Sequence, residues 1–279
     1  MKKPRLYLEM IRYIHYIICS DAFLFNSIKR TVDFSRRRKM GFTDYIYATI
    51  QNLKCSLQVG LNAFFDTHKG GQIACSKQAF SKGRQRIKPE AFRALFQSVV
   101  GKFYEEAELT SWKGYQLFGI DGTRLNLPCT TELAELYGTQ TSQGAPQVQA
   151  LVSCVYDLLH GIIVDTRFER CNSSEREAAK EMITSFQLKN VSDPVFIMDR
   201  GYPSAELIDA IVTAGHKFIM RCSTEFLRSM TLPEQDNTFE HKFAKLKHAL
   251  KLRVLKIQLP NGTTEYLATN LFDASISLD

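Results

Sequence analysis

The sequence of 279 residues predicts an α/β fold, in which a mixed sheet flanked by helices follows an all-helical region. Apolar residues recur at helical spacing through most of residues 1–105, whereas short apolar runs bounded by turn residues dominate residues 106–279. The charge is divided in the same way. Residues 1–100 carry 18 Lys and Arg against 6 Asp and Glu, while the whole chain has a formal charge of +7. We therefore expect two domains, a basic helical one and a mildly acidic one that contains the sheet.

The helical domain is expected to begin with one amphipathic helix over residues 5–30, followed by a second from Phe42 to Asn52. Residues 76–100 are typical of two helices joined by a turn, because Pro89 suits the first turn of a helix. This pattern is similar to a helix-turn-helix unit, although an ordinary helical hairpin produces it as well. The segment is therefore a candidate for contact with DNA, with either interpretation open.

Strands and helices alternate in the sheet domain. The short link from Asp157 to His160 predicts a hairpin, and Ser174 with Glu177 forms a capping box at the start of a helix. The core is predicted as strand Tyr115–Asp121, strand Val148–Tyr156, strand Gly161–Phe168, helix Ser174–Gln187, strand Val195–Asp199, helix Ser204–Ala214 and strand Lys217–Arg221. Beyond it we expect helix Phe239–Leu250, which would carry His241 and His248, and strands Leu252–Leu259 and Thr264–Thr269.

Two acids end predicted strands of this core. Asp121 follows the run YQLFGI and Asp199 follows VFIM, with a glycine close behind each of them. Ligand and catalytic groups collect beyond the carboxyl ends of buried strands, and two carboxylates there suit Mg²⁺ or Mn²⁺. Such a site supports two-ion phosphoryl transfer. The alternative for Asp199 is a helix cap or a pair with Arg200.

Basic residues cluster upstream of the first acid. They are candidates for binding DNA phosphates, because clustered cations displace counterions from nucleic acid. A solvated basic surface with no partner is the alternative. The candidates are Arg36, Arg37, Arg38, Lys39, Lys82, Arg84 and Arg86.

Other features narrow the functional classes. No apolar run reaches 18 residues, so no membrane span is expected. Seven scattered cysteines without CxxC spacing favour reduced thiols in the cytoplasm. The absence of a GxxxxGKS loop leaves a nucleotide cofactor unsupported. Glu175 and Glu177 are interpreted first as cap and surface acids, and only secondarily as catalytic candidates.

Several segments resemble a known family. The segments IDGTRLNLP and MDRGY contain the two aspartates. Three further segments share the resemblance, namely SKQAFSKGRQRIKPEAFRALF, SEREAAKEM and YLATNLFD. The chain resembles bacterial insertion-sequence transposases of the DDE class, specifically the insertion-sequence-four family. The resemblance implies a ribonuclease-H-like sheet with a β-rich C-terminal insertion. It also implies two Mg²⁺ or Mn²⁺ ions at Asp121 and Asp199, with Arg200 as a phosphate or DNA contact and with Thr123 and Tyr202 in support.

The resemblance further implies cleavage and strand transfer on double-stranded DNA, at the element's ends and at a target, by a homodimer in the bacterial nucleoid. The family's third acid is a glutamate in a Tyr-x2-Arg-x3-Glu-x6-Lys pattern, which does not occur before Asp279. We therefore expect a truncated and catalytically deficient copy. The alternatives are a stand-alone metal-dependent nuclease of the same fold and a non-catalytic DNA-binding remnant.

Overall fold

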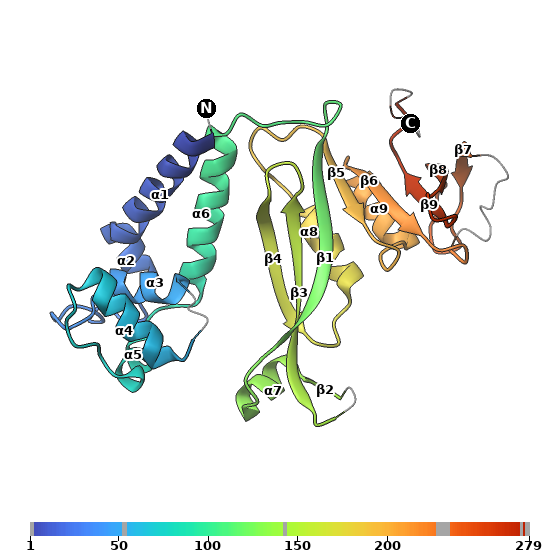
Figure 1. Cartoon of the computed structure of the whole chain (residues 1–279). Helices are drawn as coiled ribbons and strands as arrows, with labels where there is room; N and C mark the ends of the chain where they lie inside the picture. Colours follow the sequence, from blue (N-terminus) through green and yellow to red (C-terminus); the bar gives the residue numbers. More distant parts are fainter. Residues whose placement is uncertain (1–2, 52–54, 142–143, 227–234, 274–275, 277–279) are drawn as a thin grey trace. The chain divides into compact units, whose positions relative to one another are not determined.

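The computed structural model describes residues 3–51, 55–141, 144–226, 235–273 and 276. The chain divides into two compact units, Met1–Ala107 and Glu108–Asp279 (Figure 1). No helix in these described ranges is both long and apolar enough to span a membrane.

The first unit is built from helices around one apolar core. Ile46, Phe65 and Phe80 are almost completely buried in this core, and α1 packs along α6 (Figure 1). The helices are α1 Lys3–Cys19, α2 Asp21–Ser27, α3 Phe42–Ile50, α4 Leu57–His68, α5 Lys77–Arg84 and α6 Glu90–Glu106.

The single helix predicted over residues 5–30 is wrong. Ser20 has an extended backbone, with φ −78° and ψ 141°, and its side chain accepts a hydrogen bond from the backbone N–H of Phe23. Serine is a preferred N-cap because its hydroxyl replaces a missing helical partner. The chain therefore ends α1 at Cys19 and starts α2 immediately afterwards.

The second unit contains a mixed sheet. Its core strands lie in the order β4–β3–β1–β5–β6, in which β1, β5 and β6 are parallel and β3 is antiparallel to both of its neighbours. The strands are β1 Gln116–Asn126, β3 Gln147–Asp157, β4 Ile162–Arg170, β5 Pro194–Met198 and β6 Lys217–Cys222. The predicted hairpin between the second and third strands is present as β3 and β4.

Two helices cover the core sheet. Helix α8, Glu175–Thr184, packs against β1, β3 and helix α9, Ala205–Thr213, which in turn contacts β6. Strand β5 is buried along nearly its whole length. A short helix α7, Thr131–Tyr137, and strand β2, Thr139–Gln140, lie beside β3 and were not predicted.

The C-terminal strands extend the sheet beyond β6. Strand β9, Thr264–Thr269, pairs with β6 and with β8, Leu250–Gln258, which pairs with β7, Asp236–His241. The predicted helix Phe239–Leu250 is wrong, because its first residues alternate in exposure as a strand does and pair with β8. His241 lies in β7, whereas His248 lies in the following loop and is 2.9 Å from Asp209.

Candidate active site and nucleic-acid interface

Asp121 does not end its strand, contrary to the prediction. Strand β1 pairs with β5 only as far as Gly119 opposite Ile197, but it pairs with β3 as far as Asn126 opposite Gln149. Asp121 therefore lies where β1 has passed the end of its parallel neighbour. One edge of β1 is thereby open at the position of this carboxylate.

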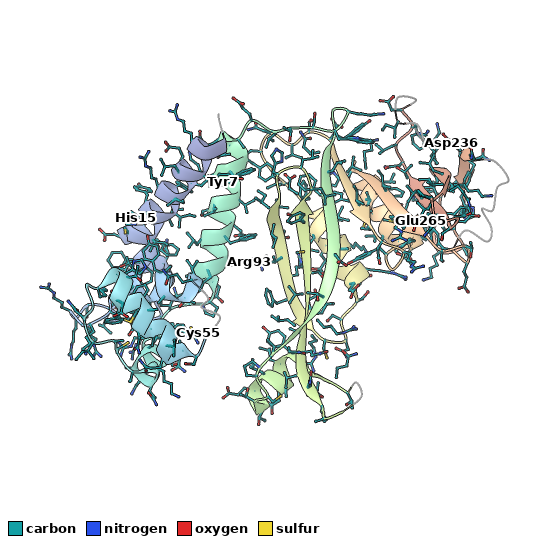
Figure 2. The ribbon with its side chains drawn as sticks, viewed as in Figure 1. Tyr7, His15, Cys55, Arg93, Asp236 and Glu265 are labelled. Atoms are coloured by element: carbon teal, nitrogen blue, oxygen red, sulfur yellow. The ribbon has the colours of Figure 1, made fainter. Side chains whose placement is uncertain are left out.

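Asp199 directly follows β5, and it meets Asp121 at one cavity. The cavity has a volume of about 450 Å³, and both aspartates line it although they are 78 residues apart in the chain. Its other lining residues are mostly apolar, apart from the ion pair Arg221–Glu265; Glu265 is labelled in Figure 2. The apolar lining consists of Ile120, Ile197, Met198, Ile219 and Leu267.

Each carboxylate is held by one oxygen. Asp121 Oδ1 accepts a hydrogen bond of 2.8 Å from the backbone N–H of Gly122, and Asp199 Oδ1 accepts one of 2.7 Å from that of Gly201. Within the described ranges, Oδ2 of neither residue has a hydrogen-bond partner. Both side chains are exposed. Each aspartate thus presents an oriented oxygen that suits a hard divalent cation.

The carboxylate oxygens of the two aspartates suit Mg²⁺ or Mn²⁺ ions that keep part of their water shell. Among the residues that the structure describes, no three His, Cys, Asp or Glu side chains could hold one ion together. Mg²⁺ commonly binds through only one or two carboxylates and keeps several waters. The two aspartates therefore fit such an ion, while the tetrahedral set of sulfur and nitrogen ligands typical of zinc is absent from this cavity.

Tyr202 lies beside these acids and is buried, with 1% of its surface exposed. Its hydroxyl has no hydrogen-bond partner in the described part of the chain. Burial raises the pKa of this phenol, and the negative charges of Glu175, Asp121 and Asp199 raise it further. Tyr202 is therefore a neutral phenol close to three carboxylates.

The other predicted supporting residues are exposed. Arg200 follows Asp199 in the turn, and no ion pair joins the two side chains. Thr123 lies on β1 opposite Val152. The cap of α9 is Ser204, which accepts the backbone N–H of Leu207, so Asp199 neither caps that helix nor pairs with Arg200.

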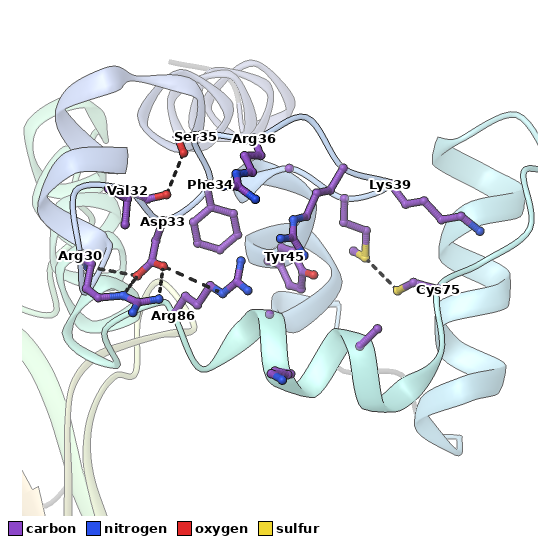
Figure 3. A pocket seen from close by; sticks show the side chains of 16 residues that line it. Arg30, Val32, Asp33, Phe34, Ser35, Arg36, Lys39, Tyr45, Cys75 and Arg86 are labelled. Atoms are coloured by element: carbon purple, nitrogen blue, oxygen red, sulfur yellow. Dashed lines mark hydrogen bonds and ion pairs between the residues drawn. The ribbon is translucent and has the colours of Figure 1, made fainter.

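A basic cavity lies within the first unit. Its volume is about 760 Å³, and its walls are the segment 30–41, α3 and α5 (Figure 3). Six cationic side chains line it, against the one acid Asp33. The cations are Arg30, Arg36, Arg38, Lys39, Lys82 and Arg86. Five of them were predicted as phosphate contacts, whereas the predicted Arg37 and Arg84 are exposed outside its lining.

Asp33 organises part of this cavity. It is 5% exposed, and its carboxylate lies 3.0 Å from Arg30 Nη2 and 4.0 Å from Arg86 Nε (Figure 3). The hydrogen bond from Arg30 lowers the pKa of Asp33. Lys39 Nζ donates to the carbonyl oxygen of Ile73. The sequence did not predict Arg30 as a lining residue. A single Lys-Arg pair after a helix does not indicate that a buried acid, here Asp33, holds the arginine at a cavity.

Three of the cationic side chains that line the cavity are available to bind a ligand. Arg36, Arg38 and Lys82 are exposed and have no hydrogen-bond or ion-pair partner within the described ranges. Phe34 and Tyr45 line the same cavity, with ring centroids 5.5 Å apart. The cavity therefore combines unpaired positive charge with aromatic surface, which suits a phosphate-bearing ligand.

Residues 112–258 match the family model described as a transposase DDE domain. The chain is 27% identical over 148 residues to the transposase InsG for insertion sequence element IS4 of Escherichia coli strain K12, covering 52% of this chain and 33% of that protein. It is 26% identical over 179 residues to the putative transposase InsZ of the same strain, and this match covers 62% of this chain and 58% of InsZ. The chain thus spans a third to about three-fifths of these relatives.

Among solved structures, the chain resembles a piggyBac transposase in a cryo-EM synaptic complex with hairpin DNA. The TM-score is 0.51 at 12% sequence identity, and the match covers 95% of this chain and 62% of that one. At this identity, the likeness concerns the fold.

Proposed function

This chain belongs to the transposase DDE domain family and is similar to the transposase of insertion sequence element IS4 and to a putative transposase. We propose that it acts in metal-dependent cleavage and strand transfer of DNA at the ends of an insertion sequence. The predicted family resemblance is confirmed by the match over residues 112–258. The observation that carries the proposed chemistry is the shared cavity of Asp121 and Asp199.

Asp121 and Asp199 are proposed to hold two Mg²⁺ or Mn²⁺ ions through their oriented carboxylates. Bound there, a pair of ions supplies activation of the attacking oxygen and stabilisation of the leaving oxygen. The backbone N–H groups of Gly122 and Gly201 hold one oxygen of each carboxylate in place. The carboxylates then need little reorganisation when ions and phosphate bind, which is the advantage of a preorganised site.

Exposed groups near the acids are proposed to position the DNA strand. The guanidinium of Arg200, next to Asp199, has no ion-pair partner among the described residues and is suited to a phosphate oxygen. Thr123 is exposed two residues after Asp121 on β1, so its side chain lies on the same face of the strand. Tyr202 is buried, so we assign it to the support of the acids rather than to DNA.

The first unit is proposed to bind duplex DNA through its basic cavity. Arg36, Arg38 and Lys82 are exposed there and form no ion pair with any residue that the structure describes, so they can neutralise phosphates without first breaking one. Arg30 and Arg86 are partly neutralised by Asp33 and contribute less. Contacts to phosphates position a protein on DNA without reading the bases, so this surface serves affinity rather than sequence choice.

Strand cleavage tests the catalytic part of the proposal. The substrate is labelled DNA that carries the element's own ends, incubated with the full chain and Mg²⁺ or Mn²⁺. Asp121→Asn and Asp199→Asn should each reduce cleavage by on the order of 100-fold or more, because a misplaced ion loses the productive geometry.

Asp165→Asn is the matched control. Asp165 lies on β4, its Oδ1 accepts the backbone N–H of Thr166 at 2.8 Å much as Asp121 does from Gly122, and it does not line the cavity. Equal cleavage by wild type and both aspartate variants would refute the proposed site. Binding of the ends without any cleavage by wild type would instead agree with the catalytic deficiency expected from the sequence, or with the alternative of a non-catalytic DNA-binding protein.

A further inference from the structure

We propose that Glu175 is a third carboxylate of the metal site, facing the ions that Asp121 and Asp199 hold. This inference rests on the proposed function. It concerns a residue that lies between the two aspartates in the chain, on helix α8. The glutamate that the family resemblance implies stands in a Tyr-x2-Arg-x3-Glu-x6-Lys pattern. Glu175 does not match this pattern, because positions 168 and 171 are Phe and Cys, so Glu175 is a separate acid.

Helix α8 is tied to the loop that carries Asp199. Arg176 Nε donates a hydrogen bond of 2.8 Å to the carbonyl oxygen of Gly201. Glu175 is the first residue of this helix, and Ser174 caps it by accepting the backbone N–H of Glu177. The cap and the arginine contact together hold the start of α8 at the turn beyond β5.

The side chain of Glu175 lies against Gly122, the residue after Asp121. A Cβ atom at position 122 would lie 2.9 Å from Glu175 Cδ and 3.2 Å from its Oε1. Only a glycine leaves this space to the carboxylate. Glu175 is half-buried there, and its carboxylate has no hydrogen-bond or ion-pair partner in the described part of the chain.

The buried hydroxyl of Tyr202 is a second observation that indicates a ligand. It is a donor and acceptor with no partner in the described ranges, and Tyr202 is only 1% exposed. Among the carboxylates whose charges raise the pKa of Tyr202, Glu175 has the largest effect, followed by Asp121 and Asp199. Buried polar groups are normally hydrogen-bonded. A water molecule bound to one of the ions at these carboxylates would supply the missing partner.

Charge balance explains why a third carboxylate is useful. Two divalent ions bring four positive charges, whereas Asp121 and Asp199 supply two negative ones. No three side chains of the described residues could share one ion, so we assign Glu175 to the second ion rather than to a common cage. Binding each ion through one or two carboxylates is usual for Mg²⁺.

Titration of the full chain with Mn²⁺ tests the proposal, read by calorimetry and by the paramagnetic signal of free Mn²⁺. We expect Glu175→Gln to weaken Mn²⁺ binding by about tenfold or more, the scale seen when groups that support metal ligands are removed. Glu177→Gln is the matched control on the same helix turn. Glu177 is 66% exposed and lies 4.0 Å from Lys180, and its change should leave Mn²⁺ affinity as in wild type.

Gly122→Ala provides an independent variant, because its Cβ would displace the Glu175 carboxylate while leaving the charge in place. It should weaken Mn²⁺ binding as well, with unchanged circular dichroism. If Glu175→Gln binds Mn²⁺ like wild type while Asp121→Asn does not, the inference is overturned and the proposed function stands. If Asp121→Asn also binds like wild type, the proposed function itself fails.

Discussion

Neutralising two arginines of the basic cavity should change the salt dependence of DNA binding. Arg36 and Arg38 line the cavity without partners in the described part of the chain, as does Lys82. Each neutralised phosphate contributes about −0.9 to the slope of log affinity against log salt. Three available cations therefore account for about −2.7, which corresponds to a ~40-fold loss of affinity between 50 and 200 mM salt.

The double variant Arg36→Gln/Arg38→Gln should flatten the slope by about 1.8. The measurement is fluorescence anisotropy of a labelled duplex, titrated with the full chain at several KCl concentrations. Arg5→Gln/Arg93→Gln is the matched control, since both residues are exposed in the same unit and lie outside the cavity; Arg93 is labelled in Figure 2. This control removes the same net charge as Arg36→Gln/Arg38→Gln.

Equal slopes for wild type and the cavity variant would refute this reasoning and place the DNA surface elsewhere. Equal flattening in both double variants would show that net charge, rather than the cavity, sets the affinity. A cavity variant with an unchanged slope but weaker binding at every salt concentration would also contradict phosphate contacts at these two positions. Only a selective flattening in Arg36→Gln/Arg38→Gln supports them.

Three further outcomes follow from buried contacts. Gly83→Ala would place a Cβ in collision with the phenol of Tyr45 and should destabilise the first unit by about 1–3 kcal/mol. Hydrogen exchange in α3 and α5 should become faster, and unchanged exchange would contradict this. Arg253→Leu removes the donors of the hydrogen bonds to the carbonyl oxygens of Leu271 and Ile276. It should lower the free energy of unfolding, measured in urea, by at least about 2 kcal/mol. An unchanged free energy of unfolding would count against these two hydrogen bonds. Burial lowers the pKa of His216 from its ordinary value of 6.5, so the unfolded chain binds more protons just below pH 6.5. Stability of the second unit should therefore be full above that pH and fall on acidification, a dependence that urea titrations should find reduced in His216→Gln.

Local patterns in the sequence determined many of the elements. Strand β5 was predicted from the run VFIM, and it is buried along nearly its whole length. The Ser174 cap starts α8 as expected, and the link Asp157–His160 joins β3 to β4. These features are readable because a cap, a turn or an apolar run involves residues close together in the chain.

Two predictions about strands failed where pairing with another segment decided the structure. Phe239 and His241 were assigned to a helix, but pairing with β8 makes the segment a strand. The first strand was predicted to end at Asp121, yet β3 carries it on to Asn126. Strand pairing is a contact between segments far apart in the chain, so a short window of sequence contains no signal for it.

The sequence alone identified the two aspartates, the basic run and the family resemblance, because residue types and motifs carry chemistry wherever they fold. Only the tertiary structure decided which residues meet. The unequal lengths of β1 and β5 place Asp121 and Asp199 at one cavity, and the packing of α8 places Glu175 over Gly122. The fold of segment 30–41 brings Arg36 and Arg38, but not Arg37, to the cavity that α5 completes, because side chains that are adjacent in sequence point in different directions.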